Sequence, residues 1–330
     1  VPRIDYTGGG CPHILAEPQR TNLVTDSQTF TGALSQVSRV SNSTDIVDPF
    51  GTNTAFKFTV LTSGADAHTR ITKSISVTNF SVSIYVNGLA GQKFQLFLAR
   101  DSYTQYFDTS KVLSGGWERI ELNGTFSTAS TTVIIGLEFG FTADDSVAGQ
   151  EYYLTGLQLE EGSYSTSYIP TSGSTVTRNQ DLFTRDGIAS LINSTEGVLF
   201  AEIVALTDND ATNRSICLSD GTTDNRILFR YEGNNLIRGF VISGGTINAN
   251  FSFTYNNINN LKFAIKWKVN DFAYWVNGTE VATDTSGATP TGLNKLAFDD
   301  NFGNNFFGKV KQVQVYKTAL TDAQLTSLTT

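Results

Sequence analysis

Short segments in which apolar and small polar residues alternate constrain the fold of this chain most strongly. Residues 81–86 read Ser-Val-Ser-Ile-Tyr-Val and stop at Asn87-Gly88, and Phe94, Leu96 and Leu98 share one face of the next segment. Successive side chains of a β-strand point to opposite faces, so a period of two predicts strands with one buried face. Asn and Gly tolerate the positive φ angles of tight turns. The pattern therefore predicts antiparallel sheets.

The same pattern continues along the chain in two series of predicted strands. The first series includes residues 117–122, 131–141 and 152–159, and the second runs from residue 198 to residue 316. A capping box at residues 321–324, Thr-Asp-Ala-Gln, predicts one short helix at the C-terminal end. We therefore predict an all-β protein that consists of two antiparallel β-sandwiches and one short C-terminal helix.

The domain boundaries follow from where small polar residues interrupt the strand pattern. Residues 170–178 read Pro-Thr-Ser-Gly-Ser-Thr-Val-Thr-Arg, which is typical of a connection between domains. We predict a lead-in segment at residues 1–17, a first domain at 18–170, a linker at 171–194 and a second domain at 195–330. Because the chain begins at Val1, we expect it to be part of a larger parent protein.

Charge and composition argue against several classes of function. The 330 residues include 23 Lys and Arg against 31 Asp and Glu, and no Lys- or Arg-rich run occurs, so nucleic acid is not an expected partner. No apolar stretch reaches the roughly 18 residues of a membrane-spanning helix, so membrane insertion is not expected. The two cysteines, Cys11 and Cys217, cannot build a disulfide framework or a thiolate zinc site.

Several stretches resemble known families. Residues 2–23, PRIDYTGGGCPHILAEPQRTNL, resemble a segment of bacteriophage tail and minor structural proteins that precedes a jelly-roll carbohydrate-binding module. Residues 157–171, LQLEEGSYSTSYIPT, resemble the closing signature of that module. The second half is similar to a concanavalin A-like lectin or laminin G sandwich, through the stretches YWVNGTEV (274–281), GKVKQVQVY (308–316) and LTDAQL (320–325).

These resemblances imply a non-catalytic protein that binds polysaccharide or a cell-surface glycan as a phage tail receptor-binding or adhesion component. They imply an extracellular location on the virion tail, contact with other tail or adhesin subunits and, by analogy with fibres, a homotrimer. Two alternatives stay open. The sandwiches could be structural spacers in a tail or adhesin, or an accessory binding region of a secreted or cell-surface enzyme that degrades polysaccharides.

The sequence predicts no catalytic residue. Glycoside hydrolysis needs two carboxylates about 5 to 9.5 Å apart, which on one strand means positions two or four apart. Glu118 and Glu121 have an odd spacing and therefore point to opposite faces. Cys11-Pro12-His13 places a thiol beside a base, but in a Gly-rich segment with no third group nearby. We expect no required cofactor.

Sugar recognition needs aromatic rings that stack on a sugar and polar groups that bind its hydroxyls. In the first half Arg100, Tyr103 and Tyr106 lie in a polar stretch beside a strand, and Trp117 begins another strand. We predict that these residues bind carbohydrate. Burial in the core is the alternative for Trp117, and a plain exposed loop is the alternative for the two tyrosines. His68 is expected on a loop or strand edge, where it could donate a hydrogen bond to a ligand.

Four further candidates lie in the second half. Arg230 and Arg238 flank a turn at residues 233–235 and could clasp the carboxylate of an acidic sugar, with a solvated hairpin as the alternative. The neighbouring Tyr231 is included as a binding residue. Trp275 points to the opposite face from the other aromatic residues of its strand, so one of these two sets should approach the surface.

Two loops are rich in the oxygen ligands that calcium prefers. Asp208-Asn209-Asp210 and Asp299-Asp300-Asn301 are the candidates, and ordinary turns are the alternative for both. A structural calcium ion is therefore an open prediction without a fixed set of ligands.

Overall fold

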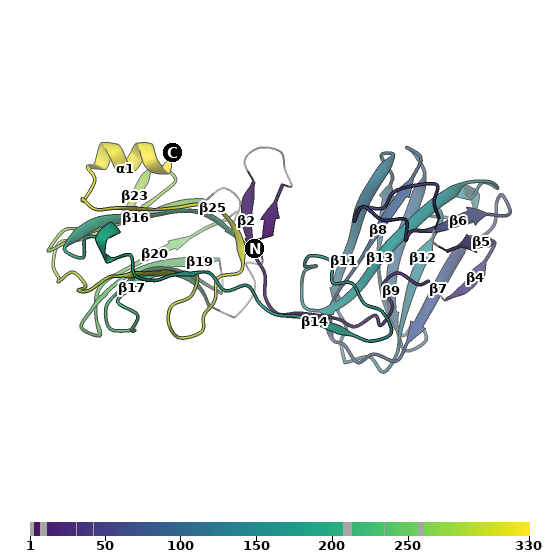
Figure 1. Cartoon of the computed structure of the whole chain (residues 1–330), viewed down its shortest axis with the longest axis horizontal. Helices are drawn as coiled ribbons and strands as arrows, with labels where there is room; N and C mark the ends of the chain where they lie inside the picture. The colour runs from purple at the N-terminus through teal and green to yellow at the C-terminus, as the bar shows by residue number, and fades with distance from the viewer. Residues whose placement is uncertain are drawn as a thin grey trace. The chain divides into compact units, whose positions relative to one another are not determined.

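The computed structural model describes residues 3–6, 12–30, 32–41, 43–206, 213–233, 235–256 and 261–330. The chain divides into two compact units: unit 1 consists of Val1–Pro18 together with Gln180–Thr330, and unit 2 consists of Gln19–Asn179. The described residues form two large antiparallel sheets in each unit and one two-stranded ladder in unit 2 (Figure 1). The predicted fold class, two β-sandwiches with one short C-terminal helix, is therefore confirmed.

Unit 2 is built from two five-stranded sheets, which we call sheet I and sheet II. Sheet I has the order β10 (Gln105–Val112), β9 (Lys93–Arg100), β12 (Val133–Glu138), β7 (His68–Lys73) and β4 (Ala33–Ser35). Sheet II has the order β11 (Gly116–Thr125), β8 (Asn79–Gly88), β13 (Glu151–Glu161), β6 (Phe56–Val60) and β5 (Val37–Val40). A short ladder of β3 (Arg20–Asn22) and β14 (Val176–Arg178) joins the first and last segments of the unit.

The core of unit 2 follows from the alternation of side chains along its strands. Phe94, Leu96 and Leu98 of β9 are fully buried, as are Ile135 and Leu137 of β12, and all five belong to one apolar cluster between the two sheets. Burial of these side chains removes apolar surface from water, at about 25 cal/mol per Å². The residues between them therefore point to the outer face of sheet I.

Unit 1 contains a seven-stranded and a six-stranded sheet. The first has the order β1 (Arg3–Asp5), β2 (His13–Ala16), β25 (Gly308–Tyr316), β16 (Glu196–Ala205), β21 (Leu261–Lys268), β22 (Phe272–Val276) and β23 (Thr279–Asp284). The second has the order β15 (Thr184–Arg185), β24 (Lys295–Ala297), β17 (Arg214–Ser219), β18 (Arg226–Glu232), β19 (Leu236–Ser243) and β20 (Thr246–Thr254).

The helix α1 (Asp322–Thr329) packs on the outer face of the seven-stranded sheet, where it contacts β21, β22 and β23 (Figure 1). Its capping box is formed as predicted, because the Thr321 hydroxyl accepts a hydrogen bond from the backbone N–H of Gln324. Leu325 is fully buried against Trp275 and its neighbours. Among the described residues, no helix has the length and apolar character needed to cross a membrane.

The first strands of the chain belong to unit 1, although residues 1–17 are expected from the sequence to be a separate lead-in. β2 pairs with β25, with Ile14 opposite Val310, so the hairpin β1–β2 extends the seven-stranded sheet. An ion pair of 2.6 Å between Lys309 and Asp5 ties the hairpin to β25. Unit 2 is thus inserted between β2 and the rest of unit 1. The chain returns to unit 1 at Gln180, and β14 and β15 both form within the predicted linker.

Candidate functional site

The strand register of sheet I brings outward-facing side chains from four strands into rows. Asp108 of β10 lies opposite Phe97 of β9, which lies opposite Gly136 of β12, which in turn lies opposite Arg70 of β7. Neighbouring strands are about 4.8 Å apart. Residues that are up to 66 positions apart in the sequence, Arg70 and Gly136, therefore share one short row across the sheet.

A second row lies beside the first and is polar throughout. It contains Ser110, Gln95, Glu138 and His68, in that order from β10 to β7. The side-chain amide of Gln95 donates hydrogen bonds to Asp108 (2.9 Å) and to Ser110 (3.1 Å). These two rows thus combine the aromatic ring of Phe97 with amide, carboxylate, imidazole and guanidinium groups.

Three aromatic rings gather around a pocket of about 410 Å³ on this face. We call it the aromatic pocket; its lining consists of Arg70, Gln95, Phe97, Tyr103, Tyr106 and Asp108. Phe97 lies close to Gly136, where a Cβ atom would come within 1.9 Å of the ring. The ring centroids of Phe97 and Tyr103 are 5.9 Å apart, and Tyr103 and Tyr106 are exposed. Aromatic surface is therefore available to a ligand.

The turn that carries Tyr103 has an unusual backbone conformation and is stabilised by hydrogen bonds from a neighbouring segment. Asp101, Ser102 and Tyr103 all have positive φ angles, of 45°, 61° and 70°. Non-glycine residues adopt this region rarely, and such strain concentrates at functional sites. The carboxylate of Asp101 accepts hydrogen bonds from the backbone of Thr131 (2.9 Å) and Thr132 (3.0 Å). These bonds lower the pKa of Asp101 to about 2, so the carboxylate is ionised when it anchors the turn.

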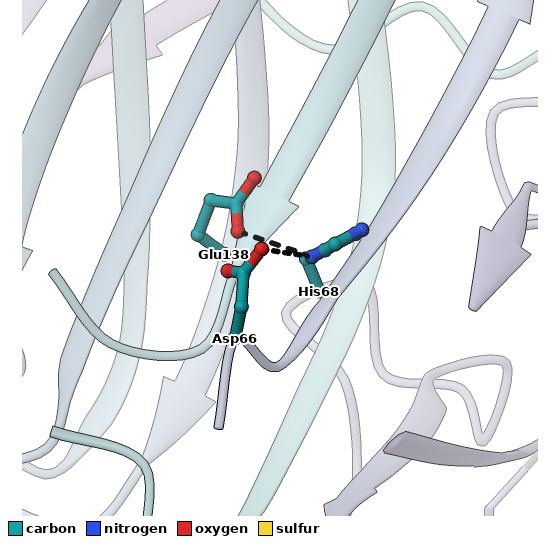
Figure 2. A group of neighbouring side chains, drawn as sticks. All are labelled: Asp66, His68 and Glu138. Atoms are coloured by element: carbon teal, nitrogen blue, oxygen red, sulfur yellow. Dashed lines mark ion pairs between the residues drawn. The ribbon is translucent and has the colours of Figure 1, made fainter. Parts of the chain in front are cut away.

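A second pocket, of about 230 Å³, adjoins the first and shares Arg70 and Gln95 with it. We call it the polar pocket. Asp66 and Glu138 belong to its lining, and His68 Nδ1 lies 3.2 Å from Asp66 and 3.6 Å from Glu138. Figure 2 shows these three side chains. Arg70 pairs with Glu138 at 3.2 Å and with Asp66 at 3.8 Å. Burial raises the pKa of Glu138 to about 7, against the opposing effect of Arg70.

Asp66, His68 and Glu138 are also a group that could hold a metal ion, because their ligand atoms all lie within 4.8 Å of one another (Figure 2). Arg70 already supplies a positive charge to both carboxylates. A divalent cation would lie next to this guanidinium, and the two cations would repel each other. We therefore interpret the group as an ion-pair network.

The structure brings together only two of the candidates predicted in the first half. Tyr103 and Tyr106 both line the aromatic pocket. Arg100 does not line it, because its guanidinium binds the backbone and hydroxyl oxygens of Thr128. Trp117 lies in β11 of sheet II, is partly buried, and donates a hydrogen bond from Nε1 to the Val47 carbonyl at 2.9 Å.

The candidates of the second half are paired or buried within the protein. Arg230 and Arg238 do lie opposite each other on β18 and β19, but both bind the carboxylate of Glu232, at 2.5 Å and 3.0 Å. The carboxylate that they clasp is therefore the chain's own. Tyr231 and Trp275 are buried, with 4% and 5% of their surface exposed, so neither ring can stack on a sugar.

The structure describes one of the two loops that were predicted to bind calcium. Asp208-Asn209-Asp210 lies outside the described residues. Asp300 is fully buried and its carboxylate accepts hydrogen bonds from the backbone of Phe302 (3.0 Å) and from the side chain of Asn304 (2.7 Å). Such hydrogen bonds from a side-chain carboxylate to its own loop are typical of ordinary turns. Calcium binding stays a prediction.

The two carboxylates considered for catalysis are each engaged with other side chains. Glu118 binds Ser114 and Lys111, whereas Glu121 pairs with Arg119. Cys11 lies outside the described residues, and burial raises the pKa of the Cys217 thiol.

Apart from Tyr103 and Tyr106, the residues that line the two pockets were not among the sequence candidates; they include Asp66, Arg70, Gln95, Phe97, Asp108 and Glu138. A signal for Glu138 was present, because it ends the apolar strand Val-Ile-Ile-Gly-Leu-Glu.

No protein-family model and no curated protein sequence matches this chain. Among solved structures, it is similar to the Ruminococcus gnavus IT-sialidase CBM40, with 15% identity, coverage of 44% of this chain and 98% of that one, and a TM-score of 0.37. It is also similar to TmCBM61, solved in complex with β-1,4-galactotriose (13% identity, coverage of 43% and 99%, TM-score 0.33). A third similar structure is that of domains LG4-5 of the mouse laminin α1 chain (11% identity, coverage of 77% of this chain and 88% of that one, TM-score 0.30).

Proposed function

We propose that unit 2 binds carbohydrate, without catalysis, at the outer face of sheet I. The observation that carries this proposal is the aromatic pocket, in which Phe97, Tyr103 and Tyr106 surround one cavity next to hydrogen-bonding side chains. An aromatic ring can stack on the apolar face of a sugar, and Gln95, Asp108 and Arg70 can bind its hydroxyls. Concave sites of this composition are typical of small-ligand binding.

Two features hold this site in shape before a ligand arrives. The approach of Phe97 to Gly136 fixes the floor of the pocket, and the bonds of Asp101 fix the turn that presents Tyr103. A preorganised site loses less conformational entropy on binding. Each site is shallow, so we expect weak affinity for a single sugar and higher avidity where several copies act together.

We further propose that the chain acts in a phage tail as a receptor-binding or adhesion component, outside the cell and in contact with other tail subunits. The resemblance of residues 2–23 and 157–171 supports this role. A homotrimer is the oligomer that we propose, and light scattering of the purified chain would test it. A monomer at micromolar concentration would contradict this part of the proposal.

A glycan array followed by affinity electrophoresis tests the binding function. Tyr106 is 62% exposed at the pocket, and Tyr6 is 73% exposed in unit 1. Tyr106→Ala should weaken binding about tenfold, as expected for loss of a contact worth more than 1 kcal/mol. Tyr6→Ala is the matched control and should bind like the unchanged chain. Equal binding by both variants, or reducing ends that accumulate from the bound polysaccharide, would contradict the proposal.

A further inference from the structure

The two pockets of sheet I contain more negative than positive charge. Asp66, Glu138 and Asp108 contribute carboxylates, and among the described residues that line the pockets Arg70 is the one Lys or Arg side chain. His68 pairs with Asp66 and Glu138 but is not among the residues that line the two pockets. Above about pH 7, where Glu138 is ionised as well, the three carboxylates outnumber the one guanidinium and the local charge is acidic.

Other cations near the pockets are already paired with acids. Lys93 pairs with Asp145 at 2.6 Å, and Arg100 lies 3.7 Å from Asp101. Each of these pairs is neutral as a whole. They leave the balance of charge inside the pockets unchanged.

The guanidinium of Arg70 is also engaged within the protein. It binds Glu138 and Asp66, and it lies 5.7 Å from the ring centroids of both Phe97 and Tyr103. To pair with a carboxylate on a ligand, Arg70 would have to share the charge that now compensates Glu138. Loss of this guanidinium would leave the ionised carboxylate of Glu138, which is buried, without its compensating charge.

We infer that the sugar site of sheet I accepts uncharged sugars and discriminates against sugars that carry a carboxylate. This inference rests on the proposed function. A uronic or sialic acid would bring its carboxylate to Asp108, Asp66 and Glu138, and like charges placed together oppose binding. A neutral sugar brings hydroxyl groups instead, and a hydroxyl that donates to an ionised carboxylate forms a stronger hydrogen bond than one to a neutral acceptor.

The test compares, at pH 8, polysaccharides that differ only in charge; at this pH Glu138 is ionised. Starch, β-galactan, mannan and soluble cellulose oligomers are each used as they are and after oxidation of their C6 hydroxymethyl groups to carboxylates. We expect at least one neutral polymer to bind, and its oxidised counterpart to bind at least about tenfold more weakly, a factor that corresponds to 1.4 kcal/mol. Because salt screens charges at exposed sites, this difference should shrink in 1 M NaCl. A steric cause would not respond to salt.

Asp108→Asn is the variant that isolates the charge, since it keeps the size of the side chain. It should raise the affinity for the oxidised polymer relative to the affinity for the neutral polymer. The control is Asp144→Asn, a change outside both pocket linings, which should leave this ratio of affinities unchanged. Equal or preferred binding of oxidised polymers would overturn the inference while the proposed function still stood. Binding of no polymer, neutral or oxidised, would overturn the proposed function and the inference with it.

Discussion

The ring of Phe97 occupies the space that a side chain on Gly136 would need: a Cβ atom on Gly136 would lie 1.9 Å from Cε1 of Phe97. Gly136→Ala should therefore displace the ring, lower the free energy of unfolding by about 1–3 kcal/mol as overpacking does, and weaken glycan binding. Chemical denaturation and affinity electrophoresis measure the two effects.

A double-mutant cycle separates this contact from other causes. In a Phe97→Ala background the Gly136→Ala change should cost little stability, because the clashing ring is gone. If Gly136→Ala lowers the free energy of unfolding equally in that background, contact with the Phe97 ring is not the reason that position 136 requires glycine.

Asp101 should stabilise the chain only where its carboxylate is ionised. Its pKa is lowered to about 2 in the folded state, below the ordinary value of 3.8, so its contribution is present above about pH 4 and is lost as the pH falls through 2. Asp101→Asn should lower the urea midpoint at pH 5, and the difference from the unchanged chain should disappear near pH 2. Because the turn carries Tyr103, the same variant should also bind glycan more weakly.

Glu138 should give the opposite dependence on pH. Its pKa is raised from 4.5 to about 7 by burial, so between these values the folded state holds a proton that the unfolded state has released. Stability should therefore fall as the pH rises from 5 to 8, by about 1–3 kcal/mol. Glu138→Gln, with the same size and no charge, should flatten this part of the profile. An unchanged slope in the variant would assign the effect to a group other than Glu138.

The docking of α1 depends on Leu325, which is fully buried in the cluster that contains Trp275. Leu325→Ala should lower the stability of unit 1 by about 2–5 kcal/mol, because a cavity remains where the side chain was. Ser327→Ala, an exposed change on the same helix, is the control. Glycan binding should be equal in both variants, since the proposed site belongs to unit 2. Calorimetry and affinity electrophoresis give the two readouts.

Alternation along single strands could predict which residues point outward, but not which strands become neighbours. Phe94, Leu96 and Leu98 were predicted to share a face, and they are buried together in the core. The same alternation places Gln95 and Phe97 outside. That Phe97 meets Gly136 and that Gln95 meets Glu138 depends on the register of β9 with β12, which long-range packing determines.

Two residues of unit 1 that were predicted to bind carbohydrate, Tyr231 and Trp275, are buried for different physical reasons. Tyr231 lies between Arg230 and Glu232 on one strand, so the period of two that turns both charged residues outward turns Tyr231 into the core. The sequence contained this information. Trp275, in contrast, is covered by α1, and its burial depends on a helix that begins 47 residues later.

The insertion of unit 2 into unit 1 has a consequence for the order of events on the ribosome. The hairpin β1–β2 is synthesised first, but β25, the strand it pairs with, begins only at Gly308. All of unit 2 emerges in between and has its own core on which to collapse. The earliest part of the nascent chain is thus among the last to reach its native position, because its closing contact is the most distant in sequence.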